Sequence, residues 1–264
     1  MSSVPLATSQ LLAPHHGPGA CPRCLNLVDR AGPCRACRAT EQHLAVIVPI
    51  SYSVGGEWLH RLIISYKRDA DRFVQDALAA ITTLLDQFIS RHECCLAAAV
   101  LPATGVGRSF DLITTVPSAD PLRDLHHPLR GIVGSACPTT RDRYERLLFR
   151  SDSVAIPRVY DPARYVPARR LDGEDVLLID DMWTSGASAE SAAGALIAAG
   201  AGTVAAIVIA RHLNRHWHDN DAQITRLAEA GFNPDRCVIC SRDRHSEPPR
   251  EQRQSLASAL QWQT

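Results

Sequence analysis

Two adjacent acids and a hydroxyl-rich turn follow an apolar segment in the second half of the chain. The acids are Asp180 and Asp181, directly after the apolar residues 176–179. The turn consists of Thr184, Ser185, Gly186, Ala187 and Ser188. Hydroxyl groups and the free N–H groups of a helix start bind phosphate. Carboxylates repel phosphate, so the two acids suit sugar hydroxyls or a hydrated Mg²⁺ ion better.

A strand and a helix are expected on the two sides of this turn. Residues 176–179 are all apolar, which is typical of a strand that is buried on both faces. Residues 187–199 are nearly all good helix formers, and Gly200 is a suitable end. A strand–turn–helix of Rossmann type with unrelated acids remains an alternative. A P-loop is excluded because the turn has no Gly-Lys-Ser/Thr sequence.

Four cysteines near the N-terminus form a second group, which could bind a metal ion. They are two C-x-x-C pairs, Cys21 with Cys24 and Cys34 with Cys37. Four thiolates in a tetrahedral array suit a closed, structural Zn²⁺ site. The alternative is a loose segment with reduced thiols. Few arginines and no aromatic residues flank the pairs, so we expect this module to brace its neighbour rather than to bind nucleic acid.

Composition limits the remaining function classes. The chain has 264 residues, enough for one α/β domain and a small module. With 28 basic and 28 acidic residues, the net charge gives no support to nucleic-acid binding. The sequence shows no apolar run long enough for a membrane span and no secretory signal. We therefore expect a cytoplasmic protein whose nine cysteines are thiols or metal ligands.

Hydrophobic patterns predict the other elements of an α/β fold with a mostly parallel sheet flanked by helices. Strands are expected at residues 44–52, 110–116 and 203–210, and helices at 57–66, 72–91 and 222–230. We expect residues 1–20 to be disordered, 21–43 to form the zinc module, 44–240 the main domain and 241–264 a flexible tail. The arginine-rich segment 122–146 is either a mobile cover or a solvated helix and loop.

The acids and the turn together resemble the loop of type I phosphoribosyltransferases that binds phosphoribosyl pyrophosphate (PRPP). The resemblance implies that Asp180 and Asp181 are the catalytic acids that hold the ribose, with Mg²⁺, and that the turn binds the 5-phosphate. It also implies that the loop at Ser118 and Ala119 holds pyrophosphate; a proline-bounded surface turn is the alternative reading. Purine-salvage members have an aspartate where this chain has Thr184, which argues against hypoxanthine or guanine as the acceptor.

The whole chain resembles the ComF family, whose members join a four-cysteine zinc module to a type I phosphoribosyltransferase domain and are linked to competence and DNA uptake. The resemblance rests on the cysteine pairs, the acids with their turn, Val116-Pro117, and the stretch Tyr66-Lys67-Arg68-Asp69. It implies a role for Lys67, the only lysine, in binding PRPP; an ordinary surface lysine is the alternative. The sequence departs from the family after Val116-Pro117, which puts the acceptor site and turnover in question.

Three functions follow from these patterns. The first is transfer of a phosphoribosyl group to an unidentified nitrogen acceptor. The second is a non-catalytic PRPP-binding protein or an accessory protein in DNA uptake, and the third, weakest hypothesis is a metal-dependent hydrolase. The sequence leaves open whether the chain forms a homodimer.

The remaining cysteines and histidines suggest one more site. His212, His216 and His218 could form a second metal site with Cys237 and Cys240. We expect Cys94 and Cys95 to be ordinary core cysteines.

Overall fold

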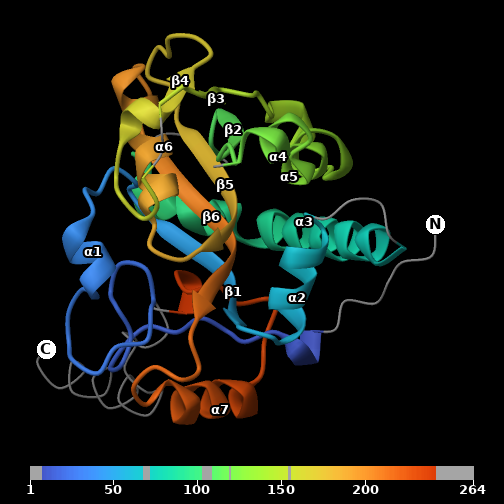
Figure 1. Cartoon of the computed structure of the whole chain (residues 1–264), viewed down its shortest axis with the longest axis vertical. Helices are drawn as coiled ribbons and strands as arrows, with labels where there is room; N and C mark the ends of the chain where they lie inside the picture. Colours follow the sequence, from blue (N-terminus) through green and yellow to red (C-terminus); the bar gives the residue numbers. More distant parts are fainter. Residues whose placement is uncertain (1–7, 68–71, 103–108, 119, 154–155, 242–264) are drawn as a thin grey trace, which may run out of the picture.

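The computed structural model describes residues 8–67, 72–102, 109–118, 120–153 and 156–241. They form an α/β fold whose central sheet is parallel and has the strand order β1–β6–β5–β2 (Figure 1). The strands are β1 (Ile47–Val54), β2 (Leu112–Thr115), β5 (Val176–Trp183) and β6 (Val204–Leu213). The longer helices are α2 (Trp58–Ser65), α3 (Arg72–Val100), α6 (Ala187–Ala198) and α7 (Asn220–Ala230).

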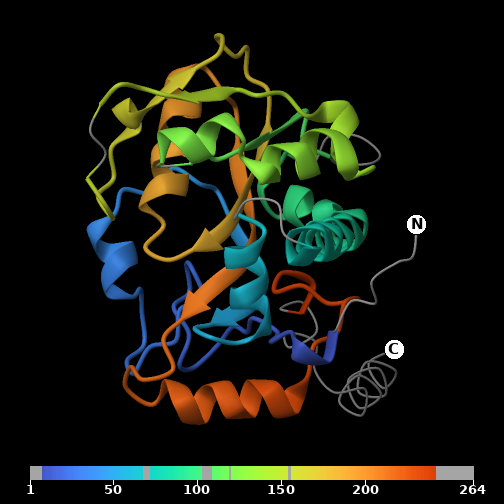
Figure 2. The same cartoon turned by 45° about the vertical axis from the view of Figure 1, so that its right-hand side comes forward.

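Helices cover both faces of the sheet, as the apolar residues of its central strands require. Side chains alternate along β5, so Leu177 and Ile179 pack in the cluster that contains residues of α2 and α3. Val176 and Leu178 pack instead in the cluster that contains residues of α6. Figure 2 shows α2 and α3 on one side of the sheet and α6 on the other.

Strand β5 is longer than its apolar sequence indicates. Residues 176–179 predict a strand that ends before the acids, but Asp180, Met182 and Trp183 still pair with β6. The two acids therefore belong to the strand, and their side chains leave it toward opposite faces. Each acid can thus meet a different layer of the fold.

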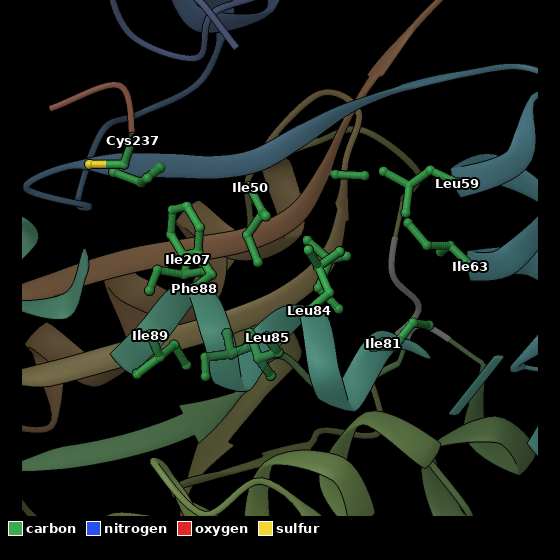
Figure 3. Packing of buried hydrophobic residues seen from close by; sticks show 14 of the residues in the cluster. Ile50, Leu59, Ile63, Ile81, Leu84, Leu85, Phe88, Ile89, Ile207 and Cys237 are labelled. Carbon is green, nitrogen blue, oxygen red and sulfur yellow. The ribbon is translucent and has the colours of Figure 1, made fainter. Parts of the chain in front are cut away.

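Helix α3 also exceeds its expected end near residue 91. It continues to Val100 through Cys94, Cys95 and an alanine-rich segment. Its side chains pack across β1 and β6, where Leu85 and Phe88 lie close to Ile50 and Ile207 (Figure 3). The alanines are strong helix formers, which explains why the helix does not end at the polar residues near Arg91.

The segment before the cysteines departs from the expected disorder. Leu11 and Leu12 are buried, and the Leu12 N–H donates to Ser51 Oγ on β1 at 2.9 Å. A short 3-10 helix, Thr8–Gln10, precedes them. The proline- and glycine-rich composition predicted disorder and gave no indication that Leu11 and Leu12 are buried. Residues 1–7 and 242–264, most of the expected tail, lie outside the described residues.

The region between β2 and β5 consists of short elements that the sequence did not predict individually. They are α4 (Pro121–Leu125), α5 (Pro128–Gly131), a π-helix at Ile132–Ala136, 3-10 helices at Arg141–Arg143 and Pro162–Arg164, and an antiparallel pair β3 (Leu148–Arg150) and β4 (Tyr165–Pro167). The N-terminal module contributes α1 (Arg35–Ala39). Among the described residues, no helix combines the length and hydropathy needed to cross a bilayer.

Candidate functional site

A pocket of about 280 Å³ lies where β2 and β5 end. This is the edge of a parallel sheet at which ligands usually bind. It brings together residues that are far apart in the sequence. The expected site residues that line it are Lys67, Ser118, Asp180, Asp181, Thr184, Ser185, Gly186 and Ser188. Ala187 is the first residue of α6, and Ala119 lies outside the described residues.

Asp181 is buried and held by two neighbours at the end of α2. The Lys67 Nζ lies 2.7 Å from its Oδ2 atom, and the Tyr66 hydroxyl donates a hydrogen bond to the same oxygen. Burial, followed by the negative charge of Asp181, raises the pKa of Tyr66 well above its usual value. Tyr66 therefore keeps its proton and remains a donor, which fixes the Asp181 carboxylate in place.

The neighbouring acid, Asp180, has a raised pKa. It is half-buried, and its Oδ1 accepts a hydrogen bond from the Asp181 N–H at 2.9 Å. Burial, and next the adjacent Asp181 carboxylate, raise the pKa of Asp180 to about 7. An acid with this pKa is partly protonated near neutral pH, and a cation that enters the pocket will favour its ionised form.

The turn before α6 depends on Gly186. This residue has φ +86°, a left-handed conformation that L side chains rarely adopt, and an added Cβ would lie 2.1 Å from the Trp183 ring. Within the described part of the chain, the N–H groups of Thr184, Ser185, Gly186 and Ser188 have no hydrogen bond. These open amides and the positive end of the helix dipole form a site for an anion.

Arg164, which the sequence did not single out, lies behind the first turn of α6. It is buried, its Nη1 is 3.5 Å from Ser188 Oγ, and its Nε has no partner among the described residues. A buried guanidinium adds positive charge beside the turn. It precedes β4, so no local sequence pattern connects it with the site.

His127 was also missed as a pocket residue. It lines the pocket, and its Nδ1 is buried without a hydrogen-bond partner in the described residues. Burial is the main cause that lowers the pKa of His127, so the ring is neutral at neutral pH. No local sequence pattern marked His127 as a pocket residue.

The Ser118 loop is less open than expected. The Ser118 N–H donates to Asp124 Oδ1 at 3.0 Å, and the Ser118 Oγ accepts from the Asp120 N–H at 3.3 Å. Asp124 is buried and forms ion pairs with Arg130 at 3.3 Å and Arg146 at 2.9 Å. An anion at this loop must therefore use the Ser118 hydroxyl or displace Asp124 from the amide.

The arginines of residues 122–146 also have internal partners. In addition to the two that pair with Asp124, Arg143 pairs with Glu93 at 2.5 Å and Arg123 with Asp120 at 3.4 Å. Short helices fill the segment, and Leu122 and Leu125 are its exposed apolar residues. Its arginine content therefore serves the local fold to a large extent and is not a reserve of free positive charge.

The four N-terminal cysteines converge as expected. Their sulfur atoms all lie within 4.8 Å of one another, and the four residues are buried. Cys24 Sγ and Cys34 Sγ are 3.7 Å apart, and the Cys34 N–H donates to Cys21 Sγ at 3.3 Å. Sulfur atoms that share a tetrahedral zinc ion are about 3.8 Å apart, given Zn–S bonds of about 2.3 Å. The cluster is thus suited to a structural zinc ion.

This module is joined to the helix that begins at the turn. The Glu190 carboxylate, in the first turn of α6, is buried and accepts a hydrogen bond from Arg23 at 2.9 Å. It also accepts from the His43 N–H at 2.7 Å and the Leu44 N–H at 3.0 Å. The module therefore contacts the main domain at the first turn of α6, next to the free N–H groups of the turn at 184–188. This contact is consistent with a bracing role.

Among the described residues, the groups of possible metal ligands do not include the set of His212, His216 and His218 with the two late cysteines that the sequence allowed. The ring of His212 packs near His60, with centroids 5.3 Å apart. Cys237 and Cys240 gather with His92 and Cys95 of α3 instead. The histidines are nearer to these cysteines in the sequence, but the fold brings the cysteines to a helix that is far away in the chain.

Comparison with known proteins adds no relative. Models of protein families, curated proteins and solved structures were all searched, and none of them matches this chain.

Proposed function

We propose that this chain binds PRPP with Mg²⁺ and transfers its 5-phosphoribosyl group to a nitrogen acceptor with release of pyrophosphate. One observation carries the proposal. A single pocket unites the open amides of the turn before α6 with the carboxylates of Asp180 and Asp181. A ligand that has a phosphate a few bonds away from ribose hydroxyls matches both halves of this pocket. The proposal agrees with the resemblance to the ComF family.

The residues have separate roles in this proposal. The turn at 184–188 and the α6 dipole hold the 5-phosphate. Asp180 and Asp181 accept hydrogen bonds from the ribose hydroxyls, and Mg²⁺ neutralises the pyrophosphate when it is bound with PRPP. As pyrophosphate departs, C1 acquires oxocarbenium character and the nitrogen nucleophile attacks it. The chain contributes position and charge stabilisation, without a covalent intermediate.

In this proposal Lys67 changes its partner when PRPP binds. Its ammonium now neutralises Asp181. If PRPP brought Mg²⁺ close to the acids, Lys67 would no longer be needed to neutralise Asp181 and could contact the pyrophosphate oxygens. His127, neutral and without a partner at Nδ1, faces the same pocket and can accept a proton from the attacking amine.

A second function, PRPP binding without transfer, is favoured by the state of the Ser118 loop. Asp124 already holds the Ser118 N–H, and a carboxylate beside a pyrophosphate site repels it. A protein with the 5-phosphate turn intact and the pyrophosphate loop closed would sense PRPP rather than consume it. An accessory role in DNA uptake is compatible with this version.

Calorimetry with PRPP and Mg²⁺ tests the binding step. We expect saturable binding by the parent chain and at least about tenfold weaker binding by Asp180→Asn/Asp181→Asn, because charge-assisted hydrogen bonds to the ribose are lost. Asp142→Asn is the control, since it removes an exposed carboxylate elsewhere. Equal affinity in parent and double variant would refute the site.

Pyrophosphate release from PRPP separates the two functions. A panel of nitrogen acceptors, with hypoxanthine and guanine as expected negatives, is incubated with PRPP, Mg²⁺ and the chain. Acceptor-dependent release that is lost in Asp180→Asn/Asp181→Asn supports transfer. Tight PRPP binding without any release across the panel supports the sensor.

A further inference from the structure

A second group of metal-ligand side chains lies outside the pocket. It consists of His92 and Cys95 from α3 and Cys237 and Cys240 from the segment after α7. One ligand atom from each residue lies within 4.8 Å of the others. His92 and Cys237 are buried, and the other two are half-buried. None of the four lines the pocket that contains Asp180 and Asp181.

The hydrogen bond of His92 Nε2 leaves Nδ1 available to bind a metal. Its Nε2 lies 2.9 Å from the carbonyl oxygen of Pro234, which can only accept, so Nε2 carries the hydrogen. Nδ1 is then the lone-pair nitrogen, and it is 3.9 Å from Cys95 Sγ. A carbonyl that fixes the outer nitrogen of a histidine is the usual support of a metal-ligating ring. The Phe88 ring, 4.8 Å away between centroids, further limits its rotation.

The sulfur atoms are also arranged as a ligand set. Cys95 follows His92 by three positions on a helix, so both side chains project from one face. Cys237 and Cys240 form a C-x-x-C pair, and the Cys237 N–H donates to Cys240 Sγ at 3.1 Å. Tetrahedral zinc with Zn–S of about 2.3 Å and Zn–N of about 2.0 Å requires ligand separations of roughly 3.5–3.8 Å. Small side-chain rotations reach these values from the observed distances.

We infer that His92, Cys95, Cys237 and Cys240 bind a second zinc ion, which fastens the C-terminal segment to α3. Three sulfurs and one imidazole select zinc among the common divalent ions, and four protein ligands leave no open position for substrate. The role of this ion is therefore structural.

The surrounding fold shows what the ion would fasten. Residues 231–236 contain no helix or strand, and beyond them only residues 237–241, a turn that leads into two helical residues, are described. Cys237 lies at the margin of the apolar cluster formed by α3 and the sheet (Figure 3). Two polar links join this segment to α3 beside the site. They are the hydrogen bond between His92 and the Pro234 carbonyl at 2.9 Å and the exposed pair of Arg91 and Asp235 at 3.2 Å. A zinc ion at the four ligands supplies a strong attachment at this position.

Metal content of the full chain, expressed in zinc-supplemented medium, tests the inference. Elemental analysis should give two zinc ions per parent chain and one fewer in Cys237→Ser/Cys240→Ser. Cys94→Ser is the matched control, because Cys94 is exposed, lies next to Cys95 and is outside the group; it should retain two. Unchanged zinc in Cys237→Ser/Cys240→Ser would overturn the site.

A second variant covers the case in which that protein does not fold. His92→Cys keeps four ligands but changes the donor set from three sulfurs and one nitrogen to four sulfurs. In the cobalt-substituted chain, the inference predicts unchanged stoichiometry and a shift of the visible d–d bands to longer wavelength with stronger thiolate charge transfer. A cobalt spectrum identical to that of the parent would show that His92 is not a ligand and would refute the proposed set.

Discussion

The ammonium of Lys67, at the end of α2, lies 2.7 Å from the Oδ2 atom of Asp181, which belongs to β5. The only lysine of the chain thus pairs with a buried acid of the candidate site. This contact forms because β5 continues through the acids and turns Asp181 toward the α2 layer, whereas Asp180 faces the layer of α6. Sheet alternation therefore gives two adjacent acids different partners.

Two substitutions test whether the positive charge of Lys67 contributes to PRPP binding. Lys67→Met keeps much of the side-chain length but removes the charge, and we expect PRPP affinity to fall roughly 10- to 100-fold, the worth of a hydrogen bond to a charged group. Lys67→Arg, which keeps the charge, should lose less. Calorimetry with PRPP and Mg²⁺ provides the comparison. Parent-like affinity in Lys67→Met would assign the lysine to Asp181 alone.

Asp180 predicts a pH dependence of stability. Its pKa rises from 3.8 to about 7 on folding, so its favourable contribution to folding is complete below pH 4 and is lost as the pH rises through 7. Asp180→Asn mimics the neutral acid. It should match the parent near pH 4 and exceed it at pH 8 by roughly 2–4 kcal/mol in the free energy of unfolding, measured without ligand. A variant that is less stable than the parent at pH 8 would contradict the raised pKa.

Alanine substitutions at Gly186 and Gly173 separate the cost of a left-handed backbone from the cost of a steric clash. Gly186 and Gly173 both have φ +86°, but only at Gly186 does an added Cβ collide, with the Trp183 ring. Gly173→Ala should cost about 1–2 kcal/mol, the left-handed backbone penalty. Gly186→Ala should cost clearly more and abolish PRPP binding. Urea unfolding of both variants measures the difference, and equal losses would mean that Trp183 moves aside freely.

The N-terminal cysteine cluster should act on the turn through Glu190. Cys21→Ser/Cys24→Ser should remove one zinc ion and destabilise the chain by at least about 2 kcal/mol, because a structural zinc ion contributes folding energy directly. Since Arg23 bonds to Glu190, the first turn of α6 should also exchange its amide hydrogens faster. Hydrogen exchange read by mass spectrometry tests this, with Cys94→Ser as control. Unchanged protection of α6 would limit the module to its own fold.

Much of the sheet could be predicted from the sequence, because its strands are short apolar runs and its helices have clear amphipathic or alanine-rich patterns. The extension of β5 through Asp180 and Asp181 could not, since the strand continues through backbone pairing with β6. For the same reason the opposite directions of the two acids were not foreseen. Local patterns describe local structure, whereas these features depend on which strand is the neighbour.

The candidate site shows the same division. The turn at 184–188 and the acids form one continuous motif, so their proximity was predictable. The contact of Asp124 with the Ser118 N–H and the position of Arg164 behind α6 result from tertiary packing. The association of Cys237 and Cys240 with α3 is of this kind too, because the chain length between the cysteines and His92 gives no geometric information.

The most direct test of the proposed PRPP site is the titration of the ¹⁵N-labelled chain with PRPP and Mg²⁺, followed by amide NMR. The proposal predicts that the largest shift changes occur at the N–H groups of Thr184, Ser185, Gly186 and Ser188, which are free of hydrogen bonds in the described structure. Saturation by PRPP that leaves these four amides unchanged, or the absence of any binding, would contradict it.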